Sequence, residues 1–141
     1  MPFEHRDHQA DVVLVAWGPT LAEAFRSGAQ GMLALMVNTP DIEAAIPVEI
    51  TCEADDLGAL FVTFLNEILY EQDCRGMFFR EVKVADVAER TGGYLLRGTA
   101  WGEPVDFGKH RVRAEVKAAT YGRLQYAYEA GIHRLECIVD L

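Results

Sequence analysis

The chain has 141 residues and carries 13 Lys and Arg against 22 Asp and Glu, which gives a formal net charge of −9. Half of the residues are hydrophobic and a quarter are charged, which excludes global disorder, and the length favours one domain over residues 1–141. No apolar run approaches the ~20 residues of a membrane span, and the charged N-terminus lacks a signal-peptide core. A negative surface also disfavours tight direct binding of nucleic acid. We therefore expect a cytoplasmic globular protein that binds neither a membrane nor nucleic acid directly.

The three cysteines, Cys52, Cys74 and Cys137, are far apart in the sequence and form no C-x-x-C pair. This spacing predicts neither a zinc knuckle nor a redox pair, and a sparse, odd count suits a reducing compartment. Cys52 and Cys137 lie in strand-like segments, so we expect both to be small core residues.

Hydrophobic patterns in the first third of the chain predict a strand, a helix and a second strand. Residues 12–17 are an apolar, β-branched run ended by Gly18-Pro19, which is typical of a buried strand. Thr20 and Glu23 form a T-x-x-E capping box that opens a helix, with Gly28-Ala29-Gln30-Gly31 inside it as a close-packing feature and Asn38 and Pro40 at its end. Residues 46–53 alternate strictly, so Ile46, Val48, Ile50 and Cys52 should face inward.

A second helix is predicted after Asp55 and Asp56, which are suited to cap its N-terminus. Its apolar stripe is wide, so the helix should be heavily buried, and Gly76 should end it. The stripe comprises Leu57, Leu60, Phe61, Phe64, Leu65, Ile68 and Leu69. Asn66, Glu67 and Glu71 fall on the opposite, polar side, which usually faces solvent.

The remaining patterns are those of β-strands. Residues 78–89 and 94–101 flank the hairpin signal Arg90-Thr91-Gly92-Gly93, and residues 124–129 and 132–139 flank Ala130-Gly131. Residues 112–118 also alternate, which predicts another strand. The sequence therefore predicts an α+β domain of mostly antiparallel β-sheets with two packed α-helices, on one sheet face or between sheets.

Acidic residues at the two chain ends are the first candidates for a binding site. Asp7-His8-Gln9-Ala10-Asp11 concentrates carboxylates and imidazole just before a buried strand, and such groups can converge on a hard cation such as Ca²⁺, Mg²⁺ or Mn²⁺. Asp140 lies next to the terminal carboxylate of Leu141, and the two groups repel unless something positive lies between them. A solvated turn and a frayed terminus are the alternatives for these two segments.

Basic residues concentrate in the last third of the chain, at Lys109, Arg111, Arg113, Lys117 and Arg123. On the predicted strand, Arg111, Arg113 and Lys117 would share one face and could meet an acidic partner or a nucleotide phosphate. A solvated strand face is the alternative.

The signatures of common enzyme sites are missing from the sequence. Gly108-Lys109-His110 does not have the spacing of a P-loop, no G-x-S-x-G is present, and no Cys/His nucleophile pair stands out. We therefore predict no catalytic residues.

Five motifs in order resemble the archease family over almost the full chain. They are D-H-x-A-D (Asp7 to Asp11), T-L-x-E-A-F (Thr20 to Phe25), F-L-N-E-I-L-Y (Phe64 to Tyr70), E-V-K-A-A-T-Y (Glu115 to Tyr121) and the Asp140-Leu141 end. Each motif is weak alone, and their order and the total length make the match specific. The family commonly has His after the Thr-Tyr pair, where this chain has Gly122, so no role of that His is carried over.

The resemblance implies a small, non-catalytic activator of an RtcB-type RNA ligase, which seals spliced tRNA halves. Such an activator promotes guanylylation and multiple turnover of the ligase. It also implies a divalent cation bound by Asp11, Asp140 and the C-terminal Leu141, with Ca²⁺ expected and Mg²⁺ or Mn²⁺ as alternatives. Asp7, His8 and Lys117 are candidates for supporting or partner contacts.

Two other functions are compatible with the sequence. One is a chaperone or modulator of tRNA-modifying enzymes such as a tRNA methyltransferase. The other is a metal-dependent phosphohydrolase that uses the Asp cluster, against which the absence of an evident nucleophile or base argues.

Overall fold

The computed structural model describes the backbone of residues 2–8 and 11–141, and the side chains of residues 2–5 and 11–141. Within these residues the elements are, in chain order, β1 (Phe3–His8), β2 (Asp11–Gly18), α1 (Leu21–Met36), the short 3₁₀ helix η1 (Thr39–Asp41), β3 (Ile46–Ala54), α2 (Leu57–Arg75), β4 (Met77–Arg90), β5 (Gly93–Pro104), β6 (Ala118–Glu129) and β7 (Ile132–Asp140).

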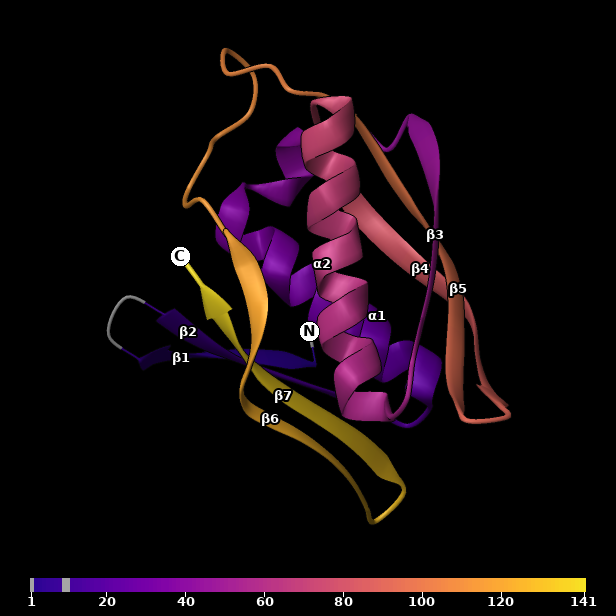
Figure 1. Ribbon diagram of the computed structural model, residues 1–141. Helices are drawn as coiled ribbons and strands as arrows, with labels where there is room; N and C mark the ends of the chain where they lie inside the picture. The colour runs from indigo at the N-terminus through magenta and orange to yellow at the C-terminus, as the bar shows by residue number, and fades with distance from the viewer. Residues whose placement is uncertain (1, 9–10) are drawn as a thin grey trace.

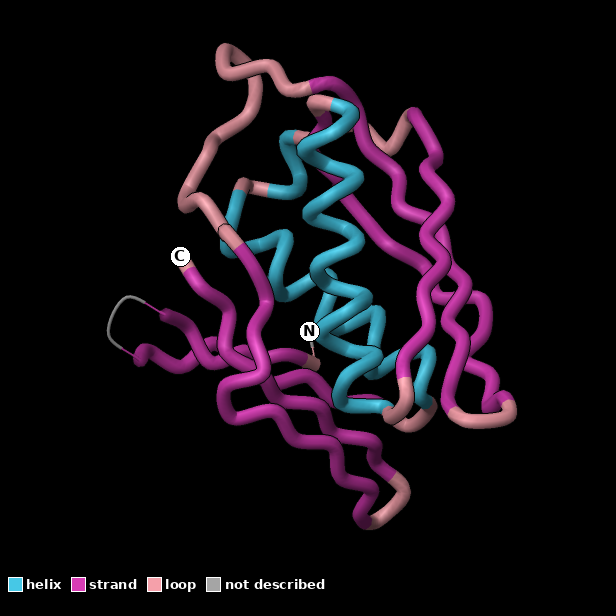
Figure 2. The backbone as a smooth tube through the Cα atoms, viewed as in Figure 1, coloured by secondary structure: helices cyan, strands magenta, loops and turns pink. Residues whose placement is uncertain are grey.

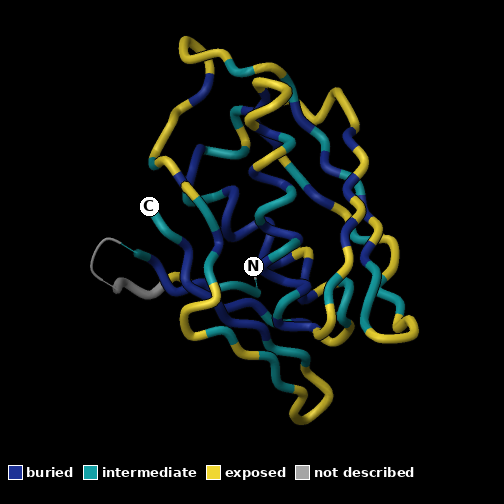
Figure 3. The backbone as a smooth tube through the Cα atoms, in the orientation of Figure 1, coloured by how far each residue is buried: buried dark blue, intermediate teal, exposed yellow. Residues whose placement is uncertain are grey.

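The strands form two antiparallel sheets with the helices between them (Figure 1). The first sheet has the order β1-β2-β7-β6 and the second has the order β3-β5-β4. Helix α1 packs against β2 and β4, and α2 packs against β3 and β6, so each helix contacts both sheets (Figure 2). Most buried residues lie on the helices and on the strand faces turned toward them, and Val13, Val15 and Ile138 form a smaller buried cluster of their own (Figure 3). The prediction of an α+β domain of mostly antiparallel sheets with two packed helices is confirmed, and of the two helix positions left open the structure has the one between the sheets.

Both helices begin and end where their capping residues predict. The Thr20 hydroxyl accepts the N–H of Glu23 at 3.1 Å, and Asp56 Oδ1 accepts the N–H of Ala59 at 2.8 Å. Gly76 ends α2 in the left-handed conformation, with φ at 61°. Every member of the predicted α2 stripe is buried.

Strand β3 has the predicted alternation, with Val48, Ile50 and Cys52 buried, although Ile46 at its start is exposed. Cys52 and Cys137 are buried free thiols, as predicted, and burial raises the pKa of both to about 12. Both hairpins form at the predicted turns, with Gly92 and Gly131 at positive φ.

Strand β1 was not predicted from the sequence, where its charged residues indicated a turn. It pairs with β2 and places Phe3 and His5 against α1. His5 Nε2 lies 3.0 Å from the Gly31 carbonyl oxygen, and a Cβ on Gly31 would lie 2.8 Å from the Phe3 ring. The prediction of close packing at this glycine is therefore confirmed, because only glycine leaves room for the β1 aromatic ring.

The strand predicted at residues 112–118 is wrong, because this segment is irregular from residue 105 to residue 117. Its backbone bonds mainly to the end of α1: Arg113 donates to the Met36 carbonyl at 2.8 Å, and Arg111 accepts from Asn38 at 2.9 Å. One isolated bridge joins Val37 to Val112. The alternating pattern therefore describes a loop that is held by the C-terminal end of a helix.

The predicted basic strip is also wrong, because the segment is not a strand and three of its cations, Lys109, Arg111 and Arg113, bond to other parts of the protein. Lys109 bonds both carboxylate oxygens of Glu103, at 2.9 and 2.8 Å. Arg111 makes two side-chain bonds of 2.9 Å with Asp41. Arg113 donates to the Ala34 carbonyl and to Asn38 Oδ1, each at 3.1 Å. These bonds hold the loop against α1 and η1.

Glu103 is the carboxylate on which the start of the loop depends. Besides Lys109, it accepts the Glu43 N–H and lies 3.1 Å from Nε2 of the buried His110. Because His110 Nδ1 accepts the Asp106 N–H at 3.0 Å, Nε2 carries the proton and donates to Glu103. The Lys109 ammonium, followed by these other donors, lowers the pKa of Glu103 from 4.5 to about 2.

This lowered pKa predicts a defined loss of stability in acid. The folded-state pKa lies below the unfolded value, so the contribution of Glu103 is complete above about pH 4.5 and is lost as the pH falls toward 2. Urea denaturation of the wild type and of Glu103→Gln should differ at pH 6 and converge between pH 4.5 and 2. A difference that stays constant across this window would contradict the assignment.

Candidate metal centre at the end of the first sheet

The fold brings the two acidic chain ends together. Asp11 is the first residue of β2, Asp140 is the last residue of β7, and the two are direct partners in the antiparallel pairing. Directly paired residues project from the same sheet face with their Cβ atoms about 4.5–5.5 Å apart. Two residues separated by most of the sequence therefore present neighbouring carboxyl groups.

The terminal residue is fixed beside this pair. The Leu141 side chain is half-buried and packs against the hydrophobic core, so the chain end is held rather than left free. Asp11 and Asp140 are also half-buried. The terminal carboxylate thus lies one residue beyond the Asp11–Asp140 pair.

Strand β6 holds the end of β7 from the other side. The Lys117 N–H donates to the Asp140 carbonyl at 2.8 Å, Ala118 pairs with Asp140, and the Thr120 hydroxyl donates to the Ile138 carbonyl at 3.0 Å. Since β2 lies along the opposite edge of β7, Asp140 is on a central strand and not on a frayed end.

Asp7, His8 and Lys117, the candidates for supporting contacts, approach this end of the sheet from β1 and from the loop before β6. The backbone of Asp7 pairs with Val12 and that of His8 pairs with Asp11, so β1 brings both residues to the Asp11 end of the sheet. Their side chains, and all of Gln9 and Ala10 in the same motif, lie outside the described residues. Lys117 reaches the site through its main chain.

The chemistry of these donors suits a hard cation. Two aspartates and a terminal carboxylate offer only oxygen atoms, and like charges placed directly opposite in a sheet destabilise it. A divalent cation would remove that repulsion. Within the described residues no group of three His, Cys, Asp or Glu side chains converges, so the Leu141 carboxylate, main-chain oxygens and water would have to complete the 6–8 donors of Ca²⁺.

Asn66 is a positioning residue that the sequence interpretation assigned wrongly to solvent. Its amide donates to the Ala119 carbonyl at 3.0 Å and accepts the Ala119 N–H at 2.8 Å. This two-point bond joins α2 to β6 next to Ala118, the partner of Asp140. Glu71, in contrast, is on the polar face as predicted and pairs with Arg75 at 2.6 Å.

A glutamine of α1 makes the same kind of two-point bond to the main chain of an edge strand. Gln30 of α1 donates to the Arg80 carbonyl at 3.2 Å and accepts the Val82 N–H at 2.7 Å on β4. A carboxamide next to an apolar stripe has no local signature that separates this role from solvent exposure. Only the tertiary arrangement of helix and strand identifies it.

The position where the family commonly has His lies in an irregular part of β6. Gly122 and Arg123 fall between the paired residues Thr120 and Gln125, and Arg123 has φ at 55°. Arg123 and Arg134 both bond the buried Glu136 of β7, at 3.2 and 3.1 Å. This departure is therefore accommodated by a bulge that an ion-pair network holds against β7.

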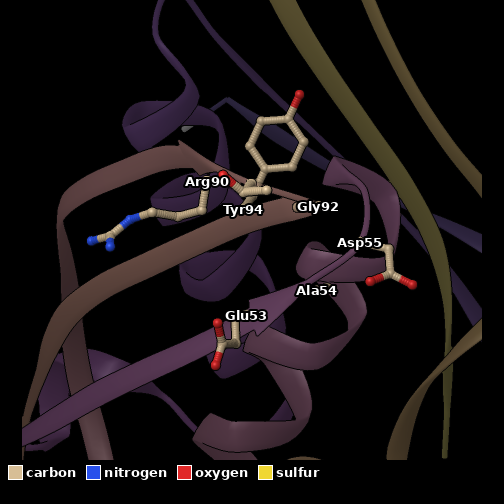
Figure 4. A pocket seen from close by; sticks show the side chains of 8 residues that line it. Glu53, Ala54, Asp55, Arg90, Gly92 and Tyr94 are labelled. Atoms are coloured by element: carbon tan, nitrogen blue, oxygen red, sulfur yellow. The ribbon is translucent and has the colours of Figure 1, made fainter.

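A hollow of about 190 Å³ lies at the β4–β5 turn, and the side chains that line it do not converge on one point (Figure 4). Glu53, Asp55 and Arg90 line it, but their side chains point apart. Among the described residues, the acidic pair at the end of the first sheet is therefore the better candidate.

The comparisons with known proteins agree with this architecture. A model of the Archease protein family (MTH1598/TM1083) matches residues 3–141. The chain belongs to the archease family. It is 40% identical to protein archease of Pyrococcus furiosus, over 84% of this chain and 83% of that protein. It is 38% identical to protein archease of Danio rerio, over 99% of this chain and 85% of that protein.

Two solved structures share the fold. Protein 1598 of Methanobacterium thermoautotrophicum is 33% identical with a TM-score of 0.85, covering 99% of both chains. An archease of Thermotoga maritima, described as a possible chaperone, is 14% identical with a TM-score of 0.57, over 96% of this chain and 94% of that one. Among the described residues, no helix is both long and apolar enough to cross a bilayer.

The two bonds of Asn66 predict a measurable stability effect. Asn66→Ala leaves the Ala119 N–H and carbonyl without their partners, which should cost about 1–3 kcal/mol in the free energy of unfolding. Asn66→Asp keeps the acceptor and loses the donor, so it should recover only part of this energy. Thr63→Ala, on the same helix, is the control, and urea denaturation is the measurement. Equal losses for Asn66→Ala and Thr63→Ala would contradict the role.

Proposed function

We propose that this protein is a non-catalytic, metal-binding protein cofactor of an RtcB-type tRNA-splicing RNA ligase. In this proposal it promotes guanylylation of the ligase and allows multiple turnover. Membership of the archease family over residues 3–141 carries the proposal. The pairing of Asp11 with Asp140 supports it, because it joins two motifs that the resemblance assigns to one metal centre.

The residues of this chain have separate parts in the proposal. Asp11 and Asp140 bind the cation from one sheet face, and the Leu141 carboxylate adds a third anionic donor. The Asn66 side chain positions β6 by bonding the main chain of Ala119, and the Lys117 N–H positions the end of β7. The bound cation would supply positive charge at the protein surface. The absence of a nucleotide-binding loop and of a nucleophile motif from the sequence favours an activating role over an enzymatic one.

The negative charge of the chain supports a protein partner over RNA. A net charge of −9 repels phosphate backbones, whereas tight general binding of nucleic acid needs several Lys or Arg contacts. The loop cations Lys109 and Arg111 are also used in internal ion pairs. Contact with tRNA would therefore be made by the ligase.

A general chaperone is the second candidate, favoured by the description of the Thermotoga maritima structure as a possible chaperone. It predicts suppression of aggregation of a tRNA methyltransferase without any effect on ligase guanylylation. A phosphohydrolase, the third alternative, predicts turnover of nucleotides by the isolated protein.

The first test is ligase guanylylation with and without this protein. Substoichiometric protein should raise the rate of covalent ligase–nucleotide formation and the number of RNA joining turnovers. Asp11→Asn and Asp140→Asn should lose this stimulation and remain folded, because both residues are half-buried at the end of the sheet and neither belongs to the buried core. Glu89→Gln, an exposed carboxylate on β4, is the control. Ligase rates that stay flat across the titration would reject the function.

The second test concerns the chain end. A C-terminal tag converts the Leu141 carboxylate into a neutral peptide carbonyl and leaves Asp11 and Asp140 in place. Because Ca²⁺ affinity falls with ligand charge, the C-terminally tagged protein should bind Ca²⁺ more weakly than an N-terminally tagged one in calorimetric titrations. It should also stimulate the ligase less. Equal affinity and equal stimulation would show that the terminal carboxylate is not a ligand.

A further inference from the structure

A partly apolar pocket of about 500 Å³ lies between the C-terminal ends of both helices and the loop of residues 105–117. We call it the loop pocket. Its apolar lining includes Met36, Leu69, Phe78 and Val116. This volume falls within the roughly 300–1,000 Å³ of typical ligand sites. In Figure 1 the loop, drawn in orange, arches away from the helices and returns to β6 near the C-terminus.

The pocket continues onto apolar surface at its edge. Phe107 is 78% exposed and Val112 is 49% exposed, and both also line the pocket. Large apolar side chains held out on a loop beside an apolar hollow are typical of a protein-binding surface. A small molecule enclosed in the pocket would leave most of the Phe107 ring in water, whereas a protein partner would cover it.

Gln72 adds a polar group to the pocket wall. It is only 7% exposed, and its Nε2 has just a long contact of 3.8 Å with the Met36 sulfur. Its Oε1 accepts no hydrogen bond from any described residue. A buried acceptor without a donor is rare and unfavourable. Met36 has a flexible side chain, and its movement would let a donor on an incoming group approach this amide.

The charged residues that line the pocket are mainly acidic. Asp73 and Glu115 line it, and no side-chain ion pair of either is found among the described residues. The nearby cations Lys109 and Arg111 are neutralised by Glu103 and Asp41, whereas Arg113 bonds to two neutral oxygens. Only Lys117 adds positive charge to the lining. With an overall charge of −9, this surface complements a positively charged partner.

Lys117 connects the loop pocket to the candidate metal centre. Its side of the loop lines the pocket, and its N–H donates to the Asp140 carbonyl at 2.8 Å. The next residue, Ala118, pairs with Asp140. Lys117 therefore lies between the loop pocket and the end of β7 that carries Asp140.

We propose that the loop pocket receives an aromatic side chain with an N–H or O–H group, carried on a positively charged segment of a protein partner. The inference rests on the proposed function, in which that partner is the RtcB-type ligase. The ring packs between the apolar walls and against Phe107, its donor satisfies Gln72, and the flanking cations lie over Asp73 and Glu115. Such anchors, Trp and Tyr above all, dominate the affinity of many protein interfaces.

The first experiment measures the affinity of the full-length protein for the purified ligase by interferometry. Phe107→Ala combined with Val112→Ala should weaken binding at least about tenfold, as expected for a central anchor. Tyr128→Ala combined with Ile46→Ala removes exposed apolar groups elsewhere and should change affinity less than about twofold. Equal effects of the two double variants overturn the inference.

Gln72→Met should raise the stability of the free protein and lower its affinity for the ligase. It replaces the unpaired amide by an apolar group of similar shape, so the melting temperature of the free protein should rise by about 2–4 °C. The same change removes the acceptor for the partner's donor and should weaken ligase binding about tenfold. A purely structural role for Gln72 would change stability and affinity in the same direction or leave affinity unaltered, and either result overturns the assignment.

Methyl NMR locates the contact directly. The chain has four methionines, and Met36 lines the loop pocket while Met32 is fully buried in the core. In protein labelled with ¹³C at the methionine methyls, saturating ligase should shift the Met36 signal and leave Met32 in place. An unshifted Met36 signal overturns the inference. A small molecule that stays bound to the purified protein in native mass spectrometry, and is lost in Gln72→Met, would also overturn it.

The two proposals can fail separately. If the wild type stimulates the ligase but the pocket variants bind it normally, the loop pocket inference fails and the proposed function stands. If the wild type neither binds nor stimulates the ligase, both fail.

Discussion

The antiparallel pairing of β2 with β7 is the constraint on which the candidate site depends. Leu14 pairs with Cys137 and Ala16 with Leu135, and all four are buried against the helices. Successive residues of a strand point to opposite faces, so this register sends Asp11 and Asp140 to the outer face. A slip of one residue would expose the core side chains, so the packing of the core also fixes the carboxylate pair. The register that buries the core therefore also places the two aspartates side by side.

The second structural requirement is that the sheets be held around the helices. Asn66 and Gln30 each use one carboxamide to satisfy both the N–H and the carbonyl at an edge strand, β6 in the first sheet and β4 in the second. Edge strands otherwise present unpaired backbone groups that favour aggregation. These two side chains therefore supply, with four hydrogen bonds, partners that a further strand would otherwise provide. Asn66 also links α2 to the strand that supports Asp140.

The parts of the fold set by local chemistry could be predicted from the sequence. Thr20, Asp56 and Gly76 fix the helix ends through bonds and backbone angles that involve only near neighbours. The hairpin at Gly131 has the same local origin. The segment 112–118 could not be predicted, because its alternating side chains suit a strand while its backbone bonds to the end of α1.

The candidate site was likewise only partly predictable from the sequence. Its oxygen chemistry and its residues follow from the motifs, but the proximity of Asp11 to Asp140 was only implied by resemblance until the register was known. Asn66 was assigned wrongly, because a polar residue on a helix has the same pattern whether it meets water or an edge strand. Strand β1 was missed for a related reason, since Phe3 and His5 gain their partner only when α1 provides the space at Gly31.

Three departures from favourable local chemistry lie near Lys117. Asp11 and Asp140 are acidic residues paired directly across β2 and β7, Gln72 has an acceptor without a donor among the described residues, and Phe107 is a largely exposed aromatic side chain. Each would be unfavourable for a protein that only had to fold. Natural sequences agree across levels of structure except where function requires otherwise. In the two proposals made above, a cation would relieve the first departure and an aromatic anchor from a partner the other two, so both proposals give these residues a role in binding that folding alone does not provide.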